Sequence, residues 1–381
     1  MESLKRLARS EGGASVIFVA ISLVMIFAFA VLAIDIGTLF VTRTQLENAA
    51  DAGALAGAMG MIQSLEDTAT AVQWAITLAG ENEAFIDGGE GVGNTRSSVV
   101  ITPEDVTFPA PYQVRVTTHR TTATGDPLRT MFLGVINPAS DGYASVRGSA
   151  TAWYYYVCGS DCFRPWAPPD RWHDENGDGF YNPDSGDYYD PDGTGYRVPD
   201  HVGVQITFML ANGNLDGFGE DWYYAVNFPP VNKGNPISGA DQYREWIEGC
   251  VDPSITVELG DTLRCEPGKM VGPTNQGVEY LIGLDPGAHW DAATQQVVGS
   301  DPIYTVSPRI IKACLFDPDI GRVDVGGGRG VVVVKMIAFF LEGRVGGGGI
   351  VGRFLQMADP GGEACDDPSD PSFLYAVKLV Q

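Results

Sequence analysis

Residues 14–34 form an apolar stretch, ASVIFVAISLVMIFAFAVLAI, whose only polar side chains are Ser15 and Ser22. A helix of that length rises about 30 Å, which matches the hydrocarbon core of a bilayer. The stretch is longer than the apolar region of a secretory signal, and no clean Ala-x-Ala cleavage site follows it. A buried core helix rarely stays uncharged for so long. The sequence therefore predicts a retained transmembrane helix over residues 14–34.

Basic residues are distributed unequally around this span. Lys5, Arg6 and Arg9 precede it, whereas Arg43 is the first basic residue after it. Basic residues accumulate on the cytoplasmic side of membrane helices. The sequence therefore predicts a cytoplasmic basic segment at residues 1–13 and places residues 35–381 on the other side of the membrane.

Composition and motifs limit the classes of function. The formal net charge is −24, from 24 Lys and Arg against 48 Asp and Glu. Nucleic acids bind basic surfaces, so no nucleic acid is expected as a partner. The Gly-rich run at 326–330 lacks the Lys and Ser or Thr of a phosphate-binding loop, so no nucleotide is expected. Gly-x-Ser-x-Gly and His-Glu-x-x-His motifs are absent, and the four histidines are isolated. We therefore expect no catalytic residues and a non-enzymatic protein.

An extended helix is predicted over residues 35–85, where Ala is frequent and Pro is absent. Within it, residues 49–58 read AADAGALAGA, and Gly53 and Gly57 share one helix face because they are four positions apart. Small side chains let a second backbone approach closely. Two partners remain open for this face. One is another helix, from the same or another subunit, and the other is the chain's own β domain.

Downstream of this helix, apolar residues recur with period two, which is typical of strands. We expect strands over residues 99–102, 112–118, 143–156, 202–209, 222–228, 254–259, 331–341, 350–357 and 374–380, and short helices over 126–136, 240–249 and 274–284. The predicted fold class is α+β, with a transmembrane and extended helix followed by a mostly antiparallel, β-rich extracytoplasmic domain. This domain comprises a strand region at 86–157 and a Gly/Pro/Asp-rich β domain at 158–381.

All six cysteines lie in the last of these segments, at Cys158, Cys162, Cys250, Cys265, Cys314 and Cys365. An even number of cysteines in an exported domain suggests disulfides. Among the pairings that six cysteines allow, proximity favours Cys158–Cys162, Cys250–Cys265 and Cys314–Cys365. Zinc is the competing use of Cys158 and Cys162, but the remaining cysteines are scattered along the chain.

The sequence DENGDGFYNPD at 174–184 is similar to a calcium-binding loop. Asp174, Asn176, Asp178 and Gly179 match its first, third, fifth and sixth positions, where oxygen ligands on alternate residues surround one cation. Ser185 stands where such a loop has its bidentate Glu, so later carboxylates would have to substitute. The candidate calcium ligands are Asp174, Asn176, Asp178, Asp184, Asp187, Asp190 and Asp192. Solvated turns are the competing interpretation, and calcium would order the loop rather than catalyse a reaction.

The segments SEGGASVIF (10–18), DIG (35–37) and TQLENAADAGALAGA (44–58) resemble the amino-terminal segment of TadG-like proteins. These proteins belong to the Tad (tight adherence) machinery, which assembles Flp-type pili in bacteria. The related TadE-like pseudopilins are processed after a Gly and have Glu as fifth residue of the mature chain. The fifth residue here is Ile17 or Phe18, which favours a retained anchor. Longer TadG proteins carry a von Willebrand A domain with an Asp-x-Ser-x-Ser metal motif, which this sequence lacks.

The resemblance implies a single-pass protein of the bacterial inner membrane, with its N-terminus in the cytoplasm and its C-terminal domain in the periplasm. The expected partners are the inner membrane and other Tad/Flp pilus-assembly proteins. The expected role is that of a non-enzymatic component or accessory of pilus assembly. The alternative is a calcium-stabilised cell-surface or periplasmic adhesion module that uses the pilus-like helix only as an anchor.

Overall fold

A computed structural model describes residues 11–64, 67–89, 93–131, 141–213, 217–366 and 372–380 of the chain. The chain divides into two compact units. The first comprises Met1–Trp153 with Lys378–Gln381, and the second comprises Tyr154–Val377. The division therefore falls between Trp153 and Tyr154 rather than at the predicted 157/158. Strand β7 (Val146–Asp161) continues through it, which is why no turn or change of composition marks the boundary in the sequence.

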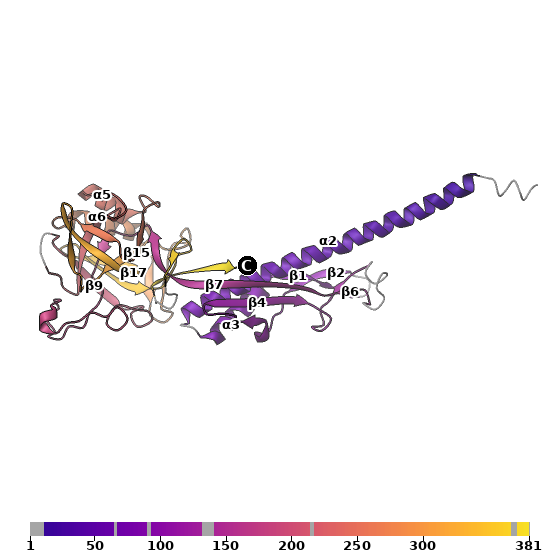
Figure 1. Ribbon diagram of the computed structural model, residues 1–381, viewed down its shortest axis with the longest axis horizontal. Helices are drawn as coiled ribbons and strands as arrows, with labels where there is room; N and C mark the ends of the chain where they lie inside the picture. The colour runs from indigo at the N-terminus through magenta and orange to yellow at the C-terminus, as the bar shows by residue number, and fades with distance from the viewer. Residues whose placement is uncertain are drawn as a thin grey trace, which may run out of the picture. The chain divides into compact units, whose positions relative to one another are not determined.

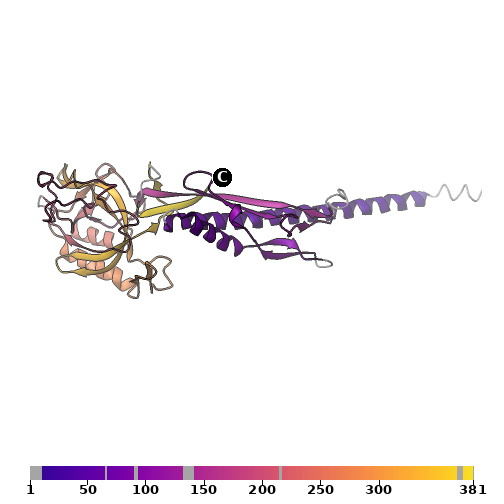
Figure 2. The ribbon, with the colours of Figure 1, turned by 90° about the horizontal axis from the view of Figure 1, so that it is seen from below.

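The first unit is built on the long helix α2 (Glu11–Gln63), drawn in indigo in Figure 1. The predicted helix over 35–85 is interrupted after Gln63. Asp67 begins a second helix, α3 (Thr68–Gly80), because its carboxylate accepts the N–H groups of Ala69 and Thr70. This helix folds back antiparallel to α2, as the shorter purple helix in Figure 2 shows, and it buries Ala71, Ala75 and Ala79. Residues 83–85, also predicted helical, lie in a strand instead.

Short strands complete the first unit. They are β1 (Glu83–Asp87), β2 (Asn94–Ser98), β3 (Val106–Thr107), β4 (Gln113–Arg120), β5 (Leu128–Arg129) and β6 (Tyr143–Ala144), and β4 pairs antiparallel with β7. Buried Val114, Val116 and Thr118 alternate along β4 and face α2. The predicted strand at 99–102 is wrong, since the chain turns there into a 3-10 helix (Pro103–Asp105). The predicted helix at 126–136 is also wrong over its described part, which contains β5; residues 132–136 lie outside the described residues.

The second unit is dominated by one sheet with the strand order β12-β10-β9-β18-β17-β15. Strand β12 also pairs with β17, so the pairing path closes on itself. The strands of this unit are β8 (Trp166–Ala167), β9 (Gln205–Leu210), β10 (Trp222–Asn227), β11 (Thr256–Glu258), β12 (Thr262–Cys265), β13 (His289–Asp291), β14 (Gln296–Val298), β15 (Ile310–Phe316), β16 (Arg322–Val325), β17 (Gly328–Val345), β18 (Gly349–Leu355), β19 (Met357–Ala358), β20 (Glu363–Ala364) and most of β21 (Leu374–Val380). The pairs β9–β10 and β19–β21 are parallel, whereas the other pairs between β8 and β20 are antiparallel over the described residues.

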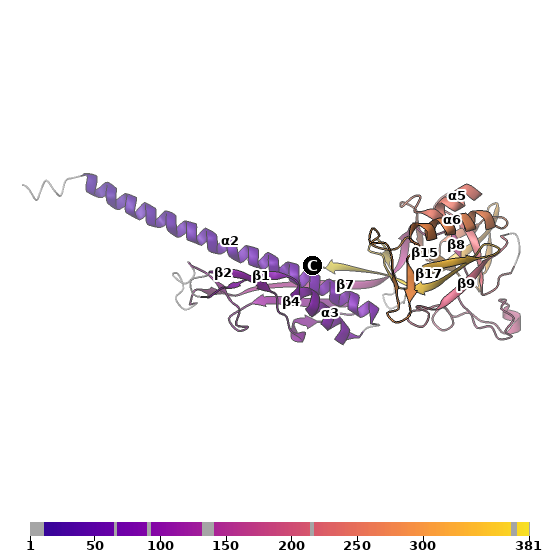
Figure 3. The same ribbon diagram turned by 180° about the vertical axis from the view of Figure 1, so that it is seen from behind.

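Two helices cover the core of this unit, α5 (Ala240–Glu248) and α6 (Val271–Leu284), which lie next to each other in Figure 3. Tyr243 and Ile247 of α5 and Val278 and Leu281 of α6 are buried in the same apolar core as the sheet. Gly277 allows this packing, because a Cβ there would lie 2.6 Å from the Cγ2 of Ile247. The predicted α+β class is confirmed: an apolar helix is followed by a mostly antiparallel, β-rich part.

Candidate functional site

The amino-terminal part of α2 presents an uncovered apolar surface. Its most apolar window has a mean hydropathy of 3.0, and none of that window is buried by the described residues. Phe18, Phe27 and Phe29 are 71%, 65% and 66% exposed. A soluble core helix would bury such side chains, whereas a bilayer accommodates them. The backbone hydrogen bonds of such a segment are satisfied within the helix itself. The chain therefore fits a single-pass membrane protein with one amino-terminal membrane helix.

Further along α2, the small-residue face packs against the same chain. A Cβ at Gly53 would lie 3.1 Å from the Cβ of Ala79 in α3 and 3.3 Å from Val116 in β4. A Cβ at Gly57 would lie 2.9 Å from Val114 in β4 and 3.4 Å from the Cβ of Ala75. The two partners that the sequence left open are thus both present within this chain, since one side of the face meets α3 and the other meets the sheet.

Two further glycines of this packing surface escaped sequence analysis. A Cβ at Gly60 would lie 2.9 Å from the Cα of Ala71, so α2 and α3 touch backbone to backbone. A Cβ at Gly148 in β7 would lie 2.7 Å from the backbone N of Glu47. Gly60 extends the series Gly53, Gly57 by three positions and was readable from the sequence. Gly148 carries no such signal, because its partner lies far away along the chain.

We expect Gly57→Leu to destabilise the first unit by about 1–3 kcal/mol, because the added side chain overpacks the contact with Val114. The matched control is Gly37→Leu in the same helix, where a Cβ meets no atom within 4 Å. This control should melt at or slightly above the wild-type temperature, since Leu favours helix over Gly. Thermal unfolding of the full chain in detergent micelles, followed by circular dichroism, measures both. Equal melting temperatures for the two variants would contradict the packing role.

The structure brings the first candidate calcium positions together in one turn. The two carboxylate oxygens of Asp174 each accept a backbone N–H at 2.7 Å, one from Gly177 and the other from Gly179. These hydrogen bonds, above all that from Gly179, lower the pKa of Asp174. The Asn176 side chain accepts the N–H of Asp178 at 2.9 Å and donates to its carboxylate at 3.1 Å. The side chains at these positions are therefore engaged in closing the loop.

The later candidate ligands do not join this turn as one cluster. Asp187 is buried and accepts two backbone N–H groups of the loop. Asp184 lies in a 3-10 turn, whereas Asp190 and Asp192 belong to a separate turn, in which Asp190 accepts the N–H of Asp192. Within the described ranges, no three His, Cys, Asp or Glu side chains form a group able to hold a metal ion. Calcium binding by this loop stays a prediction.

The structure contains two disulfides, Cys158–Cys365 and Cys162–Cys250, whose partners are 207 and 88 positions apart. The three pairings predicted from proximity are therefore wrong. The physical reason is that β7 is extended through Cys158 and ends just before Cys162. Four extended residues span about 13 Å, whereas the bonded cysteines have Cα atoms 4.7 Å apart. Strand pairing instead brings Cys365 beside β7, where its N–H donates to the carbonyl of Tyr156.

Cys265 in β12 and Cys314 in β15 carry buried thiols outside any disulfide. Burial raises the pKa of Cys265 to about 11 and also raises that of Cys314. Both thiols are therefore protonated at neutral pH and poor as nucleophiles or metal ligands. The zinc alternative loses its ligands as well, because Cys158 and Cys162 are both oxidised.

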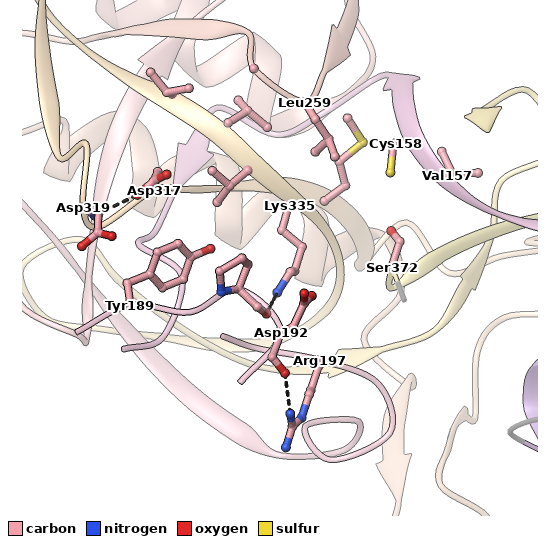
Figure 4. Close-up of a pocket in the computed structure, with 16 residues that line it drawn as sticks. Val157, Cys158, Tyr189, Asp192, Arg197, Leu259, Asp317, Asp319, Lys335 and Ser372 are labelled. Atoms are coloured by element: carbon pink, nitrogen blue, oxygen red, sulfur yellow. Dashed lines mark hydrogen bonds between the residues drawn. The ribbon is translucent and has the colours of Figure 1, made fainter. Parts of the chain in front are cut away.

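A cavity of about 890 Å³ opens in the second unit (Figure 4), and its lining mixes apolar residues of β17 with charged ones. The ammonium group of Lys335 already has three partners. Its Nζ contacts Asp170 at 3.0 Å and donates to the carbonyls of Pro191 and Tyr196. Among the acidic residues of the cavity, Asp317 accepts a backbone N–H at 2.8 Å and Asp319 accepts the Tyr181 hydroxyl. The described lining thus shows no nucleophile beside a base, and the cavity supports no catalytic assignment.

Comparison with known proteins finds a family match in the amino-terminal helix. Residues 12–60 match the family model Tad, described as Flp pilus-assembly TadE/G-like. No curated protein and no solved structure matches the chain. The matched segment includes both the apolar span and the small-residue face of α2, so the chain is a pilus-related membrane protein. The amino-terminal segment of the chain, residues 12–60, is therefore similar to TadE/G-like proteins of the Tad pilus-assembly family.

Proposed function

We propose that the chain is a membrane-anchored, non-enzymatic component or accessory of a Tad/Flp-type pilus-assembly system. One observation carries the proposal: the family match over residues 12–60 coincides with a single structural element, α2 (Glu11–Gln63). This helix offers an uncovered apolar surface for the membrane and a small-residue face that seats the first unit.

The proposed location is the bacterial inner membrane, with a cytoplasmic N-terminus and the remainder in the periplasm. Lys5, Arg6 and Arg9 before the span support this orientation. The two disulfides support it independently, because such bonds persist in the periplasm and are rare in the cytosol. In this location the acidic second unit is free to contact other pilus-assembly proteins.

Deleting the gene in the source bacterium tests the role directly. We expect the deletion strain to lose surface pili and adherence, and the full-length chain to restore both. A chain whose residues 14–34 are replaced by an unrelated transmembrane helix keeps a membrane anchor. The variant Gly57→Leu disturbs the packing of α2 against the rest of the first unit. If the pilus role depends on the small-residue face of α2, Gly57→Leu complements less well than Gly37→Leu. Normal pili and normal adherence in the deletion strain would refute the proposal.

The alternative is an adhesion module stabilised by calcium and merely anchored by the helix. The observation in its favour is that the first three candidate ligands, Asp174, Asn176 and Asp178, lie together in one closed turn. The deletion strain separates the two functions. The alternative requires pili to remain while adherence is lost, and requires a chelator to abolish adherence of the wild type but not its pili.

A further inference from the structure

The exposed surface of α2 stays uncharged for longer than a hydrocarbon core requires. From Ser15 to Thr42 the sole charged residue is Asp35, whose side chain is buried. The first exposed charge after it is Arg43, at 63% exposure. These 28 residues rise about 42 Å, which equals the hydrocarbon core together with the headgroup layers on both sides.

The part of α2 just beyond the predicted span has two different faces. One face is covered by the first unit, where Thr42 and Leu46 are fully buried. The other face remains apolar and open, because Phe40 and Val41 are 67% and 46% exposed. Phe40 lies about 9 Å beyond Ile34 along the helix axis, a depth that corresponds to the headgroup layer. The open face is therefore continuous with the membrane-spanning surface.

Asp35 fixes one end of the first unit at this same level. Its Oδ1 accepts the backbone N–H of Met131 at 2.9 Å, just after β5. The Met131 side chain is 66% exposed beside the helix. Arg129 of β5 is exposed, and it pairs in register with the partly buried Tyr143 of β6. Apolar, aromatic and basic side chains thus lie at the level where the helix leaves the hydrocarbon, together with the Asp87 carboxylate, which accepts the Tyr143 hydroxyl at 3.1 Å.

We propose that this membrane-facing edge, made of Phe40, Val41, Arg129, Met131 and Tyr143, lies in the phospholipid headgroup layer. The first unit would then rest on the bilayer surface instead of standing clear of it on a helical stalk. Continuity with the membrane-spanning surface argues for lipid as the occupant. The inference rests on the anchoring part of the proposed function and is independent of the role in pilus assembly.

Site-directed spin labelling of the full-length chain tests this contact in phosphatidylcholine vesicles. Met131→Cys carries the label at the edge. Val100→Cys is the matched control: it is 67% exposed and apolar, and the bond from the Val99 N–H to the Asn82 carbonyl places it near the Gly53 level of α2. Phe27→Cys reports the span itself. Cys265 and Cys314 are buried and should not take the label.

We expect the label at position 131 to collide more with oxygen and less with a water-soluble nickel chelate than the label at position 100. If the label at 131 is as accessible to nickel as the label at 100, while that at 27 is in lipid, the headgroup contact is refuted and the anchor stands. A label at 27 that is accessible to nickel refutes the anchor itself. Dipolar broadening at 131, with protection from both reagents, would show a second copy on this edge and would also overturn the proposal.

Discussion

The double variant Cys158→Ser, Cys365→Ser is expected to lose about 5 kcal/mol of unfolding free energy in the second unit. The bond joins residues 207 positions apart, and the entropy that a cross-link removes from the unfolded chain grows with the logarithm of that loop. The bond also ties β20 to β7 near the end of the second unit's chain. Urea unfolding of full-length protein in detergent, followed by tryptophan fluorescence, measures the loss.

The second disulfide provides a comparison with a shorter loop. Cys162–Cys250 closes 88 positions, so the same relation predicts a loss of about 4–5 kcal/mol, similar to the first. Cys314→Ala is the control, because it removes a buried thiol and leaves both disulfides in place; about 1 kcal/mol is expected. Thiol counting under denaturing, non-reducing conditions should find two thiols per chain. If the first double variant unfolds at the same urea concentration as Cys314→Ala, the connectivity is wrong.

The elements that the sequence predicts well are those specified locally. The apolar run at 14–34 lies in a helix because nothing interrupts it, and the helices predicted at 240–249 and 274–284 appear as α5 and α6. Tyr243, Trp246 and Ile247 recur at helical spacing and are all buried. The strand predicted at 374–380 is β21 itself. In each case a single face or a single run of residues is enough to predict the element.

The features that the sequence did not predict are set by contacts between distant residues. The helix predicted over 35–85 breaks between Gln63 and Thr68 although Ala is frequent on both sides. The break is a tertiary effect, since folding back lets Ala71 reach Gly60. The disulfide partners likewise depend on which strand lies beside β7. Sequence spacing alone cannot supply that pairing, and proximity along the chain therefore favoured the wrong cysteines.

The candidate sites show the same limit. The residue types and spacing around Asp174 left calcium binding and a solvated turn open, and in the structure side-chain oxygens close a turn there. They could not show that Asp187 is turned inward to accept backbone N–H groups. The sequence did not predict a partner for Asp35 in the apolar helix, yet its side chain accepts the backbone N–H of Met131. Its role became visible only because that loop returns to the helix 96 positions later.

Removal of the buried carboxylate of Asp170 is the other change with a large expected effect. Asp170 is fully buried, and its Oδ2 contacts the Lys335 Nζ at 3.0 Å and the Tyr189 hydroxyl at 2.9 Å. Its Oδ1 accepts the N–H groups of Arg171 and Tyr196. The substitution Asp170→Ala leaves the Lys335 ammonium buried without a counter-charge. We expect a loss of about 3–5 kcal/mol in unfolding free energy.

A matched control lines the same cavity. Asp192 contributes its backbone carbonyl to Arg197 but has an exposed position, so Asp192→Ala should cost no more than about 0.5 kcal/mol. Urea unfolding of both variants by tryptophan fluorescence gives the comparison. A loss for Asp170→Ala no larger than that for Asp192→Ala would show that Lys335 finds another partner.

The double variant Asp170→Leu, Lys335→Met separates two explanations of such a loss. If the pair is only a structural ion pair, replacing both charges with apolar side chains should recover much of the stability, because a buried pair gains little over well-packed apolar residues. We expect the recovery to be incomplete, since the N–H groups of Arg171 and Tyr196 lose their acceptor. A double variant as unstable as Asp170→Ala would mean that these backbone hydrogen bonds, and not the charge of Lys335, make Asp170 necessary.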